Sequence, residues 1–551
     1  MNSVQLGEIG GVGVWPFAIS IILFSLVIDK IGYGKAMAFA FISHISYGVI
    51  VICAPLMLNN DPSATPEQVA AGQKAAYWML YLGSFIFALG NGTVEAVINP
   101  VVATMFNKEK TKWLNILHAG WPGGLVIAGI IMIGMGGIDW RYKIALIFLP
   151  AIVYGVMMLG AKFPVNERVA AGGTYKEMLQ EFGVLAALIV VALIVRQLCD
   201  VFGAVEGLAF LRNIYVQLGI GAALVIAFGA YTQSLGRPML FFLMLIMIPL
   251  ATTELGTDGW ITSLMEPQMT SYGLHPAWVL VYTSFIMMVL RFFAGPIVHK
   301  LSPLGLLMVS SVIAAAGLLF LSQAAGITIL VAATLYGFGK TFFWPTMLGV
   351  VSEQCPKGGA LTLNAVGGVG MLAVGVLGFP FIGLLQANAT SAQLTAQSPE
   401  VAKQIVEEKV GIFGTYRAVE PARLAALTPK VEAANKIRAA VTAELTQKSG
   451  VAPSEEQLKE ALAANAEFAA IVSTPAFEEQ SSIVEKVTQI TDSASKGALA
   501  TMAIFPCIML AAYVALFLYF KSQGGYKAQV LTGHAAEDAK YTGGVNAPVE
   551  A

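Results

Sequence analysis

The amino-acid sequence predicts an all-α polytopic membrane protein. Of its 551 residues, 57% are hydrophobic and only 12% are charged, so the chain is far more apolar than an ordinary soluble domain. Its apolar runs often approach the length of about 20 residues with which a helix spans a bilayer. The charges gather in short turns and in one polar segment near the C-terminus. These observations predict a bundle of membrane spans with one soluble insertion.

The composition excludes several classes of function. The 32 basic and 33 acidic residues nearly cancel and form no basic patch, so no nucleic-acid partner is implied. The cysteines are scattered singly, without the spacing of a metal site or a redox pair: Cys53, Cys199, Cys355 and Cys507. No phosphate-binding loop or catalytic-triad signature is present. We therefore expect no metal, no cofactor and no enzyme activity.

The first part of the chain, residues 1–162, contains five expected spans. They lie at 11–28, 36–58, 76–104, 114–137 and 143–162. The N-terminus has no basic residue before its first apolar run, so the sequence does not predict a cleavable signal peptide. The turns SLVIDKIGYGK and NKEKTKW are rich in lysine, whereas the loop 59–74 between them is acidic. Because lysine marks cytoplasmic loops, we expect these two turns inside and the N-terminus outside.

A charged connector, residues 163–181, then joins this part to the second half. Two apolar stretches follow at 182–198 and 213–233, within the segment 182–238, and are interpreted as an inserted helix pair. A pair of interfacial helices would preserve the same topology. Six further spans are expected at 239–263, 277–298, 304–322, 326–349, 360–386 and 497–520. The chain would then have about thirteen spans and a cytoplasmic tail, residues 521–551.

One turn occurs twice. The stretch FAGPIVHKLSPLG, after the second span of the last block, repeats the turn after the first span of the chain. The matching positions are small or charged: Ser25, Asp29, Lys30 and Gly34 in the first copy, and Gly295, His299, Lys300 and Gly305 in the second. Many transporters build two halves around a central site from such repeats. We expect two pseudo-symmetric lobes, residues 1–162 and the spans from 239 to 520.

Polar side chains in the third and fourth spans form the candidate site. Glu95 and Asn99 lie four residues apart, and Asn115 and His118 three apart, so each pair shares one helix face. A carboxylate at bilayer depth costs roughly 2.5–3.5 kcal/mol on insertion scales and is a functional candidate by default. We expect Glu95 to carry a coupling proton and the other three to bind the solute. The alternative is that Glu95 is a hydrogen-bonded packing residue.

Other intramembrane residues are candidates for lining the same site: Trp121, Glu254, Asp258, Lys340 and Trp344. Buried ions are tolerated chiefly in pairs, so a salt bridge from Lys340 to Glu254 or Asp258 is expected, with a structural role as the alternative. The tryptophan rings would stack on a sugar, although such rings more often pack or anchor helices.

Charged residues near the two copies of the turn are candidates for a conformational lock. They are Asp29, Lys30, Arg291 and Lys300. Arg291 precedes the second copy and is interpreted as a cytoplasmic-side lock or a snorkelling residue rather than as a solute contact.

Four stretches resemble the major facilitator superfamily, most closely its fucose/sugar:proton symporter branch. SLVIDKIGYGK resembles the GxxxDRxGRR loop after the second family helix, with Ser25 in place of the usual Gly. VEAVINP resembles the fourth-helix ExxxNP, LNILHAGWPGG the fifth-helix LNxxQxFxxxG, and FGKTFFWPTM the tenth-helix G-F-W-P stretch. In this sequence His118 replaces the usual Gln and His299 replaces an acid.

The resemblance implies the major facilitator fold and transport by alternating access. It also implies that the family's first helix, which carries an acidic residue in the sugar symporters, is absent from this chain. We expect the gene upstream of Met1 to encode that helix in frame. It further implies a small-molecule solute, expected to be a sugar, and a proton as partners, in addition to membrane lipid. The protein is expected to be a monomer and a multi-pass protein of the cell (inner) membrane.

Residues 387–496 have a different composition, rich in Ala, Glu, Gln and Lys. Stretches such as PEVAKQIVEEKVGIF and PSEEQLKEALAANAEFAAIVST have amphipathic periodicity and predict three or four soluble helices. The expected topology places them outside the cell, as a cap over the outer mouth or as a partner-binding module.

Three functions follow from these features. The favoured one is secondary active, proton-coupled uptake of a sugar or a similar polar solute. The second is export of amphipathic compounds, which a wide apolar cavity would favour. The third is a transporter-derived sensor or scaffold that acts through residues 387–496.

Overall fold

The structure, a computed structural model, describes residues 11–59, 65–136, 138–257, 277–449 and 453–529, with isolated positions 9, 61, 269, 275 and 531. In this part of the chain ten helical stretches are long and apolar enough to cross a membrane, and Trp278–Phe292 is a shorter apolar helix. The predicted all-α polytopic fold is confirmed. The count of thirteen spans stays a prediction.

The first lobe is built from helices α2 to α8. Their bounds are α2 (Trp15–Ile31), α3 (Tyr33–Cys53), α4 (Pro66–Met105), α5 (Lys110–His118), α6 (Gly120–Met135), α7 (Trp140–Ala145) and α8 (Phe148–Met158). Helix α4 is the centre of this lobe, since both α2 and α3 pack along it. Close packing needs small residues: a Cβ atom on Gly92 would lie 2.3 Å from the carbonyl oxygen of Phe17.

Helix α4 begins earlier than the sequence pattern predicts. The expected loop 59–74 includes the first turns of this helix, because Thr65 and Gln68 form a capping box. The Thr65 hydroxyl accepts from the backbone N–H of Gln68, and the Gln68 side chain accepts from the backbone N–H of Thr65. A capping box satisfies two of the otherwise unpaired N–H groups at a helix start. The acidic, polar composition of this stretch is therefore that of a helix N-terminus.

The connector and the inserted pair contain α9 (Glu167–Ala170), α10 (Tyr175–Phe202) and α11 (Ile214–Thr232). Gly183 interrupts α10 with a φ of 61°, and a Cβ atom there would lie 2.1 Å from Gly236. Beyond this break α10 packs on the second lobe and shares its hydrophobic core, whereas α11 packs on α10 and is largely exposed. Only one helix of the pair is therefore peripheral.

Within the described residues the second lobe contains eight helices. They are α12 (Pro238–Gly256), α14 (Trp278–Phe292), α15 (Ala294–Gln323), α16 (Thr328–Lys340), α17 (Phe343–Gln354), α18 (Gly359–Ala373), α19 (Phe379–Gln397) and α26 (Ile504–Ser522). Its core is lined by small and aliphatic side chains of α12, α15 and α18. Helix α16 ends at Lys340 and α17 begins at Phe343, so Thr341 and Phe342 form a break between the two helices.

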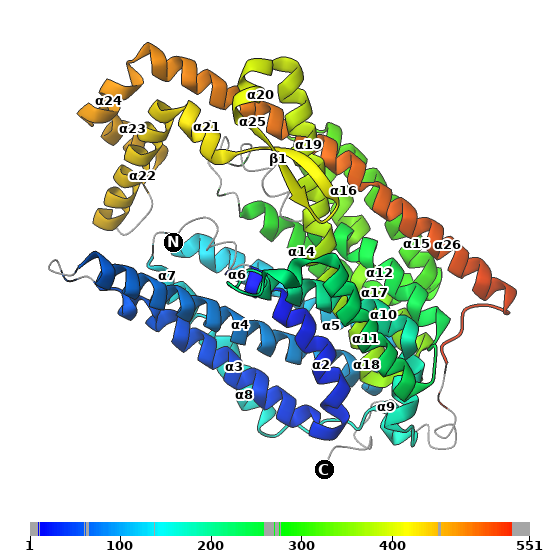
Figure 1. The fold of residues 1–551 in the computed structure, drawn as a ribbon. Helices are drawn as coiled ribbons and strands as arrows, with labels where there is room; N and C mark the ends of the chain where they lie inside the picture. The colour runs from blue at the N-terminus through cyan, green and yellow to red at the C-terminus, as the bar shows by residue number, and fades with distance from the viewer. Residues whose placement is uncertain are drawn as a thin grey trace.

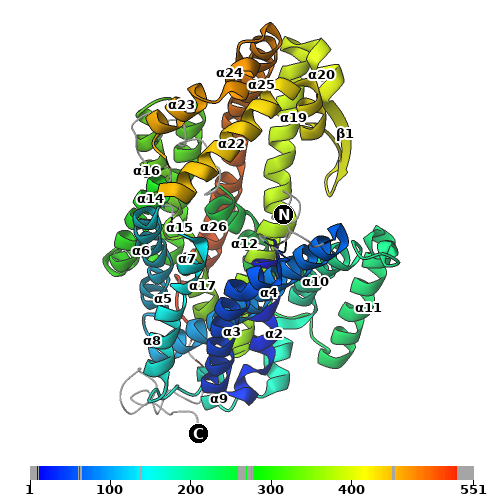
Figure 2. The ribbon, with the colours of Figure 1, turned by 90° about the vertical axis from the view of Figure 1, so that its left-hand side faces the viewer.

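The two lobes meet chiefly where α2 packs on α18, α5 on α17 and α6 on α14, and α4 also contacts α18. Figures 1 and 2 show α9 and the α2–α3 turn at one end of the molecule and the insertion at the other. We call the first of these the lysine-rich end, because the turns there carry Lys30, Lys35, Lys108, Lys110 and Lys112.

The repeated turn has the same backbone shape in both lobes. Gly32, three residues after Asp29, has φ 88° and ψ 148°, and Ser302, three residues after His299, has φ 63° and ψ 162°. This region of backbone space is populated almost only by glycine and costs other residues of order 1–3 kcal/mol. The two copies of the turn thus share a backbone conformation as well as residue types, and Ser302 is strained.

The insertion protrudes from the end of the bundle opposite the lysine-rich end (Figure 1). Its elements are α20 (Pro399–Ile405), β1 (Val406–Gly411), β2 (Gly414–Val419), α21 (Pro421–Leu427), α22 (Pro429–Ser449), α23 (Glu455–Ala463), α24 (Ala466–Val472) and α25 (Pro475–Met502). The prediction of one helix over PEVAKQIVEEKVGIF is wrong in its second half, because the chain forms an antiparallel hairpin with β1 paired to β2. The turn between the strands ends at Gly414, which has a φ of 100°.

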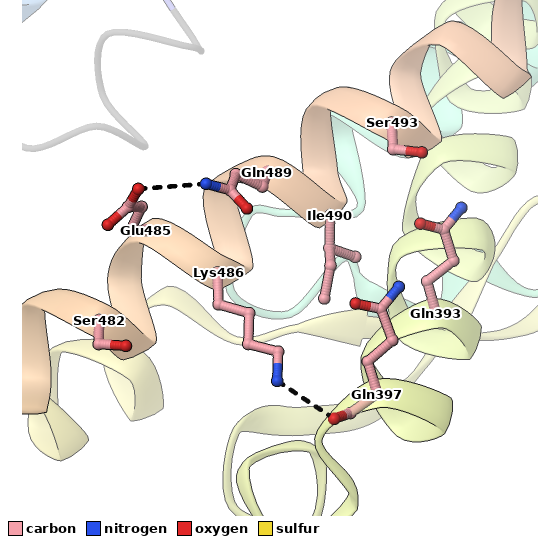
Figure 3. A pocket seen from close by; sticks show the side chains of 8 residues that line it. All are labelled: Gln393, Gln397, Ser482, Glu485, Lys486, Gln489, Ile490 and Ser493. Atoms are coloured by element: carbon pink, nitrogen blue, oxygen red, sulfur yellow. Dashed lines mark hydrogen bonds between the residues drawn. The ribbon is translucent and has the colours of Figure 1, made fainter.

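The insertion has a small core of its own, in which Leu394, Ile405, Val487 and Ile490 are buried together. Beside this core, α19 and α25 lie next to each other and enclose a polar groove of about 450 Å³ (Figure 3). Lys486 donates across this groove to the carbonyl oxygen of Gln397 at 3.2 Å. Helices α19 and α25 thus join the insertion to the second lobe without a flexible linker.

Replacing the strained serine tests whether the repeated turn is under conformational stress. We expect Ser302→Gly to stabilise the protein by about 1 kcal/mol, because glycine adopts this backbone conformation freely. The Ser302 hydroxyl accepts from the N–H of Gly305 at 3.3 Å, but exchanging such a cap for glycine costs only a few tenths of a kcal/mol. The thermal unfolding midpoint in detergent measures the change. Gly32→Ala is the opposite control and should lower that midpoint. An equal decrease of the midpoint in both variants would contradict the inferred strain at Ser302.

Candidate functional site

The predicted polar residues of the first lobe do lie together at the interface between the lobes. His118 Nε2 is 3.1 Å from Asn99 Oδ1 and 3.9 Å from Glu95 Oε1. All three residues come from the facing surfaces of α4 and α5, as the four-residue and three-residue spacings predicted. Asn99 and His118 are buried, and the Glu95 side chain is 18% exposed. A titratable pair is thus held in a largely enclosed polar cluster.

Asn364 of α18 connects this cluster to the second lobe. The Asn99 amide donates to Asn364 Oδ1 at 3.4 Å, and Asn364 Nδ2 donates to Ser25 Oγ and to the carbonyl oxygen of Ala96, both at 2.9 Å. Asn364 was not predicted as a site residue. A lone fully buried amide in the stretch LTLNAVGG was the available signal, since a buried amide needs partners from neighbouring helices.

Asn115 makes the second contact between the lobes. Its amide donates to the carbonyl oxygen of Thr111 at 2.8 Å and to Thr346 Oγ1 of α17 at 3.1 Å. Its own Oδ1 atom is buried and accepts no hydrogen bond within the described part of the chain. A buried acceptor without a donor costs roughly 1–3 kcal/mol. The cluster therefore contains an acceptor ready for one more donor.

Arg291 occupies the centre of the interface, in contrast to the cytoplasmic-side position that was expected from its place before the second turn. Its guanidinium donates to Glu254 Oε1 at 2.7 Å, to the carbonyl oxygen of Thr341 at 2.7 Å and to the carbonyl oxygen of His118 at 2.8 Å. The last two carbonyls stand at the ends of α16 and α5. Helix C-termini carry partial negative charge, so both ends favour the cation.

Glu254 is paired with Arg291 and also accepts from the backbone N–H of Trp344 at 2.9 Å. Lys340, the partner predicted for this acid, is buried with its amino group 5.7 Å from the centre of the Tyr336 ring. The other predicted partner, Asp258, lies outside the described residues. Glu254 therefore pairs with an arginine that was not predicted as its partner, and the salt bridge expected from Lys340 stays a prediction.

The two tryptophans of the prediction differ in their surroundings. Trp344 is buried and packs against α18, where a Cβ atom on Gly370 would lie 2.9 Å from its ring. Trp121, at the start of α6, is 63% exposed. Trp344 thus contacts the buried polar residues through its backbone N–H, which donates to Glu254, whereas Trp121 lies apart from them.

A second set of contacts joins the lobes at the lysine-rich end. Lys110 pairs with Glu167 at 2.6 Å and donates to the carbonyl oxygen of Ser352 at 3.3 Å. Glu353, at the end of α17, accepts from the backbone N–H of Thr111 at 3.2 Å and from its hydroxyl at 2.6 Å. Because α5 belongs to the first lobe and α17 to the second, these bonds hold the lobes together here.

The C-terminal segment takes part in the same contacts. The Tyr526 hydroxyl donates to Glu353 Oε2 at 2.7 Å, and the N–H of Gln529 donates to the Glu353 carbonyl oxygen at 2.8 Å. Gln354 donates to the carbonyl oxygen of Lys527 at 2.9 Å. We call Lys110, Thr111, Glu353 and Tyr526 the lobe interlock. This role of the tail could not be predicted from the sequence, because the polar composition of the tail is equally typical of a disordered end.

The residues predicted as a lock have different partners from one another. Asp29 forms an ion pair with Arg168 of the connector, and Lys30 lies 4.4 Å from the centre of the Tyr175 ring. Lys300 is exposed, but its neighbour His299 faces Glu109 of the first lobe at 3.2 Å. The hydrogen bond from Lys112 lowers the pKa of Glu109, and His299 acts in the same direction. The second copy of the turn therefore contacts the first lobe through its histidine.

A bundle of apolar helices in two lobes, with buried polar clusters where the lobes meet, defines a membrane transporter. The family profile of the Major Facilitator Superfamily matches residues 1–378 of the 551, and the chain belongs to that family. As a member of this family it is a transporter and not an enzyme.

Several solved structures are similar to the chain. The E. coli fucose:proton symporter is 14% identical, with a TM-score of 0.46, and the match covers 73% of this chain and 86% of that one. The E. coli xylose transporter, in an inward-open conformation, is also 14% identical, with a TM-score of 0.45 and coverage of 68% and 79%. The human organic anion transporter MFSD10 is 11% identical, with a TM-score of 0.46 and coverage of 71% and 78%. No curated protein sequence matches.

Removing one hydroxyl from the lobe interlock tests whether the C-terminal segment holds the lobes together. Tyr526→Phe leaves Glu353 Oε2 without its donor when the lobes are closed, which costs roughly 1–3 kcal/mol. Separation of the lobes exposes that oxygen to water, so the variant should favour the separated state. Spin labels at Lys108 and Lys357, in a protein without native cysteines, report the distance between the lobes.

The matched control is Tyr519→Phe, which removes the hydroxyl of an exposed tyrosine on α26. We expect a longer distance population for Tyr526→Phe and none for the control. Identical distance distributions in the two variants would show that the segment only rests on the second lobe.

Proposed function

We propose that this protein carries out proton-coupled uptake of a sugar or a similar polyhydroxylated solute by alternating access. The observation that supports the proposal best is the enclosed polar cluster between the lobes, in which an acceptor without a donor, Asn115 Oδ1, lies one helix turn from His118, which neighbours Glu95. A solute hydroxyl supplies the missing donor. The resemblance of VEAVINP and LNILHAGWPGG to sugar-symporter motifs supports the same substrate class.

The proposal requires lobes that separate easily, and the central contacts are suited to this. The neutral hydrogen bonds from Asn99 to Asn364 and from Asn115 to Thr346 cross the interface, as does the bond from Arg291 to the His118 carbonyl. A neutral bond contributes about 0.5–1.5 kcal/mol net, and one that involves a charge about 1.5–3 kcal/mol. Bound solute hydroxyls replace these bonds when the lobes part. The same groups then serve as lobe contacts and as solute contacts.

In this mechanism Glu95 is the residue that binds and releases the coupling proton. The ionisation of a carboxyl group depends on its exposure to water and on nearby charge, and both change as the lobes rock. A protonated Glu95 is neutral and tolerates enclosure, whereas an ionised one favours a hydrated site. His118, at 3.9 Å, is the competing candidate for this role.

A solute panel in proteoliposomes tests the substrate class. We expect sugars to accumulate when the outside is more acidic than the lumen, and to stop accumulating when a protonophore dissipates the gradient. Nucleosides, organic acids and amphipathic cations should accumulate less. Transport of amphipathic cations alone, in exchange for protons, would instead support the exporter function.

The Glu95→Gln variant tests whether Glu95 is needed for proton coupling but not for solute binding. The amide keeps the size and much of the hydrogen bonding of the acid but does not titrate, so we expect proton-driven accumulation to be lost while solute exchange persists. His118→Gln should leave accumulation largely intact. Uptake with a pH gradient and counterflow without one are the two measurements.

Glu67→Gln is the matched control, because it removes an exposed acid from the first turn of the same helix, α4. It should transport as the wild type does. If Glu95→Gln concentrates solute at the wild-type level, Glu95 is a packing residue, and His118, Glu254 and Asp258 become the candidates for coupling.

A further inference from the structure

A groove of about 510 Å³ runs between α3 and α8 on the outer surface of the first lobe, at its lysine-rich end. Ten of its eleven lining residues have no charge and no polar side-chain atom, among them Ala38, Phe41, Ile152 and Val156. The eleventh is Lys162, just beyond the end of α8. The groove is therefore apolar along its length and cationic at one end.

Two glycines create this shape. At Gly155 an added Cβ atom would lie 2.6 Å from the Phe41 ring, so the helices approach each other closely there. A Cβ atom added at Gly34 would lie 3.7 Å from its nearest atoms, those of the Phe163 ring. The absence of a side chain at Gly34 therefore leaves room at the cationic end of the groove. Val156 is 62% exposed, so this surface faces the hydrocarbon of the membrane. Lipid chains are the natural occupants of such a surface.

The cation at the end of the groove has no ion-pair partner among the described residues. Two other cations at this end are paired, Arg168 with Asp29 and Lys110 with Glu167. Lys162 is exposed and lies at the end of the bundle that carries most lysine turns, which the positive-inside rule assigns to the cytoplasmic leaflet. That leaflet contains the anionic phospholipids, and basic pockets between helices on this side bind their head groups.

We propose that the groove between α3 and α8 is a binding site for one anionic phospholipid. An acyl chain fills the apolar part, and the phosphate pairs with Lys162 at its mouth. The inference does not depend on which solute the protein carries.

The floor of the groove connects the lipid to the connector between the lobes. Phe163 packs against Tyr33, with ring centres 6.4 Å apart, and the Tyr33 hydroxyl accepts from Asn166 at 3.1 Å. Asn166 in turn caps α9 by accepting from the N–H of Arg168, the partner of Asp29. A bound chain restrains Phe163 and so steadies this connection, which predicts a higher unfolding temperature with lipid bound.

Native mass spectrometry of the full chain, titrated with phosphatidylglycerol or phosphatidylcholine in detergent, tests the proposal. We expect phosphatidylglycerol to bind the wild type more tightly than phosphatidylcholine does. Lys162→Gln should weaken phosphatidylglycerol binding about fivefold and leave phosphatidylcholine unchanged, since one lysine near a membrane surface contributes roughly that factor. Phosphatidylglycerol should also raise the unfolding temperature of the wild type more than that of Lys162→Gln.

Two further variants keep the experiment decisive. Lys521→Gln removes an exposed lysine at the end of α26 and should bind lipid as the wild type does. Ala38→Phe fills the groove from a lipid-facing position and should weaken binding of both lipids. Equal phosphatidylglycerol binding by Lys162→Gln and the wild type would overturn the proposal. So would the same thermal stabilisation by inorganic phosphate alone, because the groove would then have no part in it.

Discussion

A guanidinium inside the membrane part of the bundle is the constraint on which the rest of the interface depends. Arg291 stays protonated, and an uncompensated charge at bilayer depth is costly. Its nitrogens are satisfied by Glu254 and by the carbonyl oxygens of Thr341 and His118. These carbonyls are available because α16 and α5 end beside the arginine. The breaks in the two helices therefore serve the same cation, and one of them belongs to the opposite lobe.

The interface has two layers of different strength. In the centre, neutral amide and hydroxyl contacts cross between the lobes around Asn99 and Asn115, beside one charged contact from Arg291 to the His118 carbonyl oxygen. At the lysine-rich end the contacts involve ionised groups, with Glu353 shared between Thr111 and Tyr526. Hydrogen bonds to ionised groups are roughly twice as strong as neutral ones. In the described residues the end layer has more bonds to ionised groups across the interface than the centre, as the proposed exchange of the neutral central bonds with a solute requires.

The repeat illustrates how backbone conformation and side-chain chemistry can diverge. Gly32 and Ser302 share one unusual backbone conformation, but the charged residues beside them have different partners. Asp29 pairs with the connector of its own half, whereas His299 reaches Glu109 across the interface. A repeated turn therefore predicts equivalent backbone positions well. It does not predict equivalent contacts, because these depend on the neighbouring segment in each lobe.

Much of the fold was determined by the sequence alone, because hydropathy and helix periodicity are local properties. The apolar runs predicted the membrane helices, and the spacings of Glu95 with Asn99 and of Asn115 with His118 predicted shared helix faces. Only the tertiary structure decided which groups became partners. Asn364 meets Asn99 across 265 positions of the chain, and Arg291 pairs with Glu254. Hydrophobic periodicity also did not predict the hairpin in the insertion or the capping box that extends α4. Partner choice depends on how each helix is rotated and where it is broken, and packing against other helices determines both.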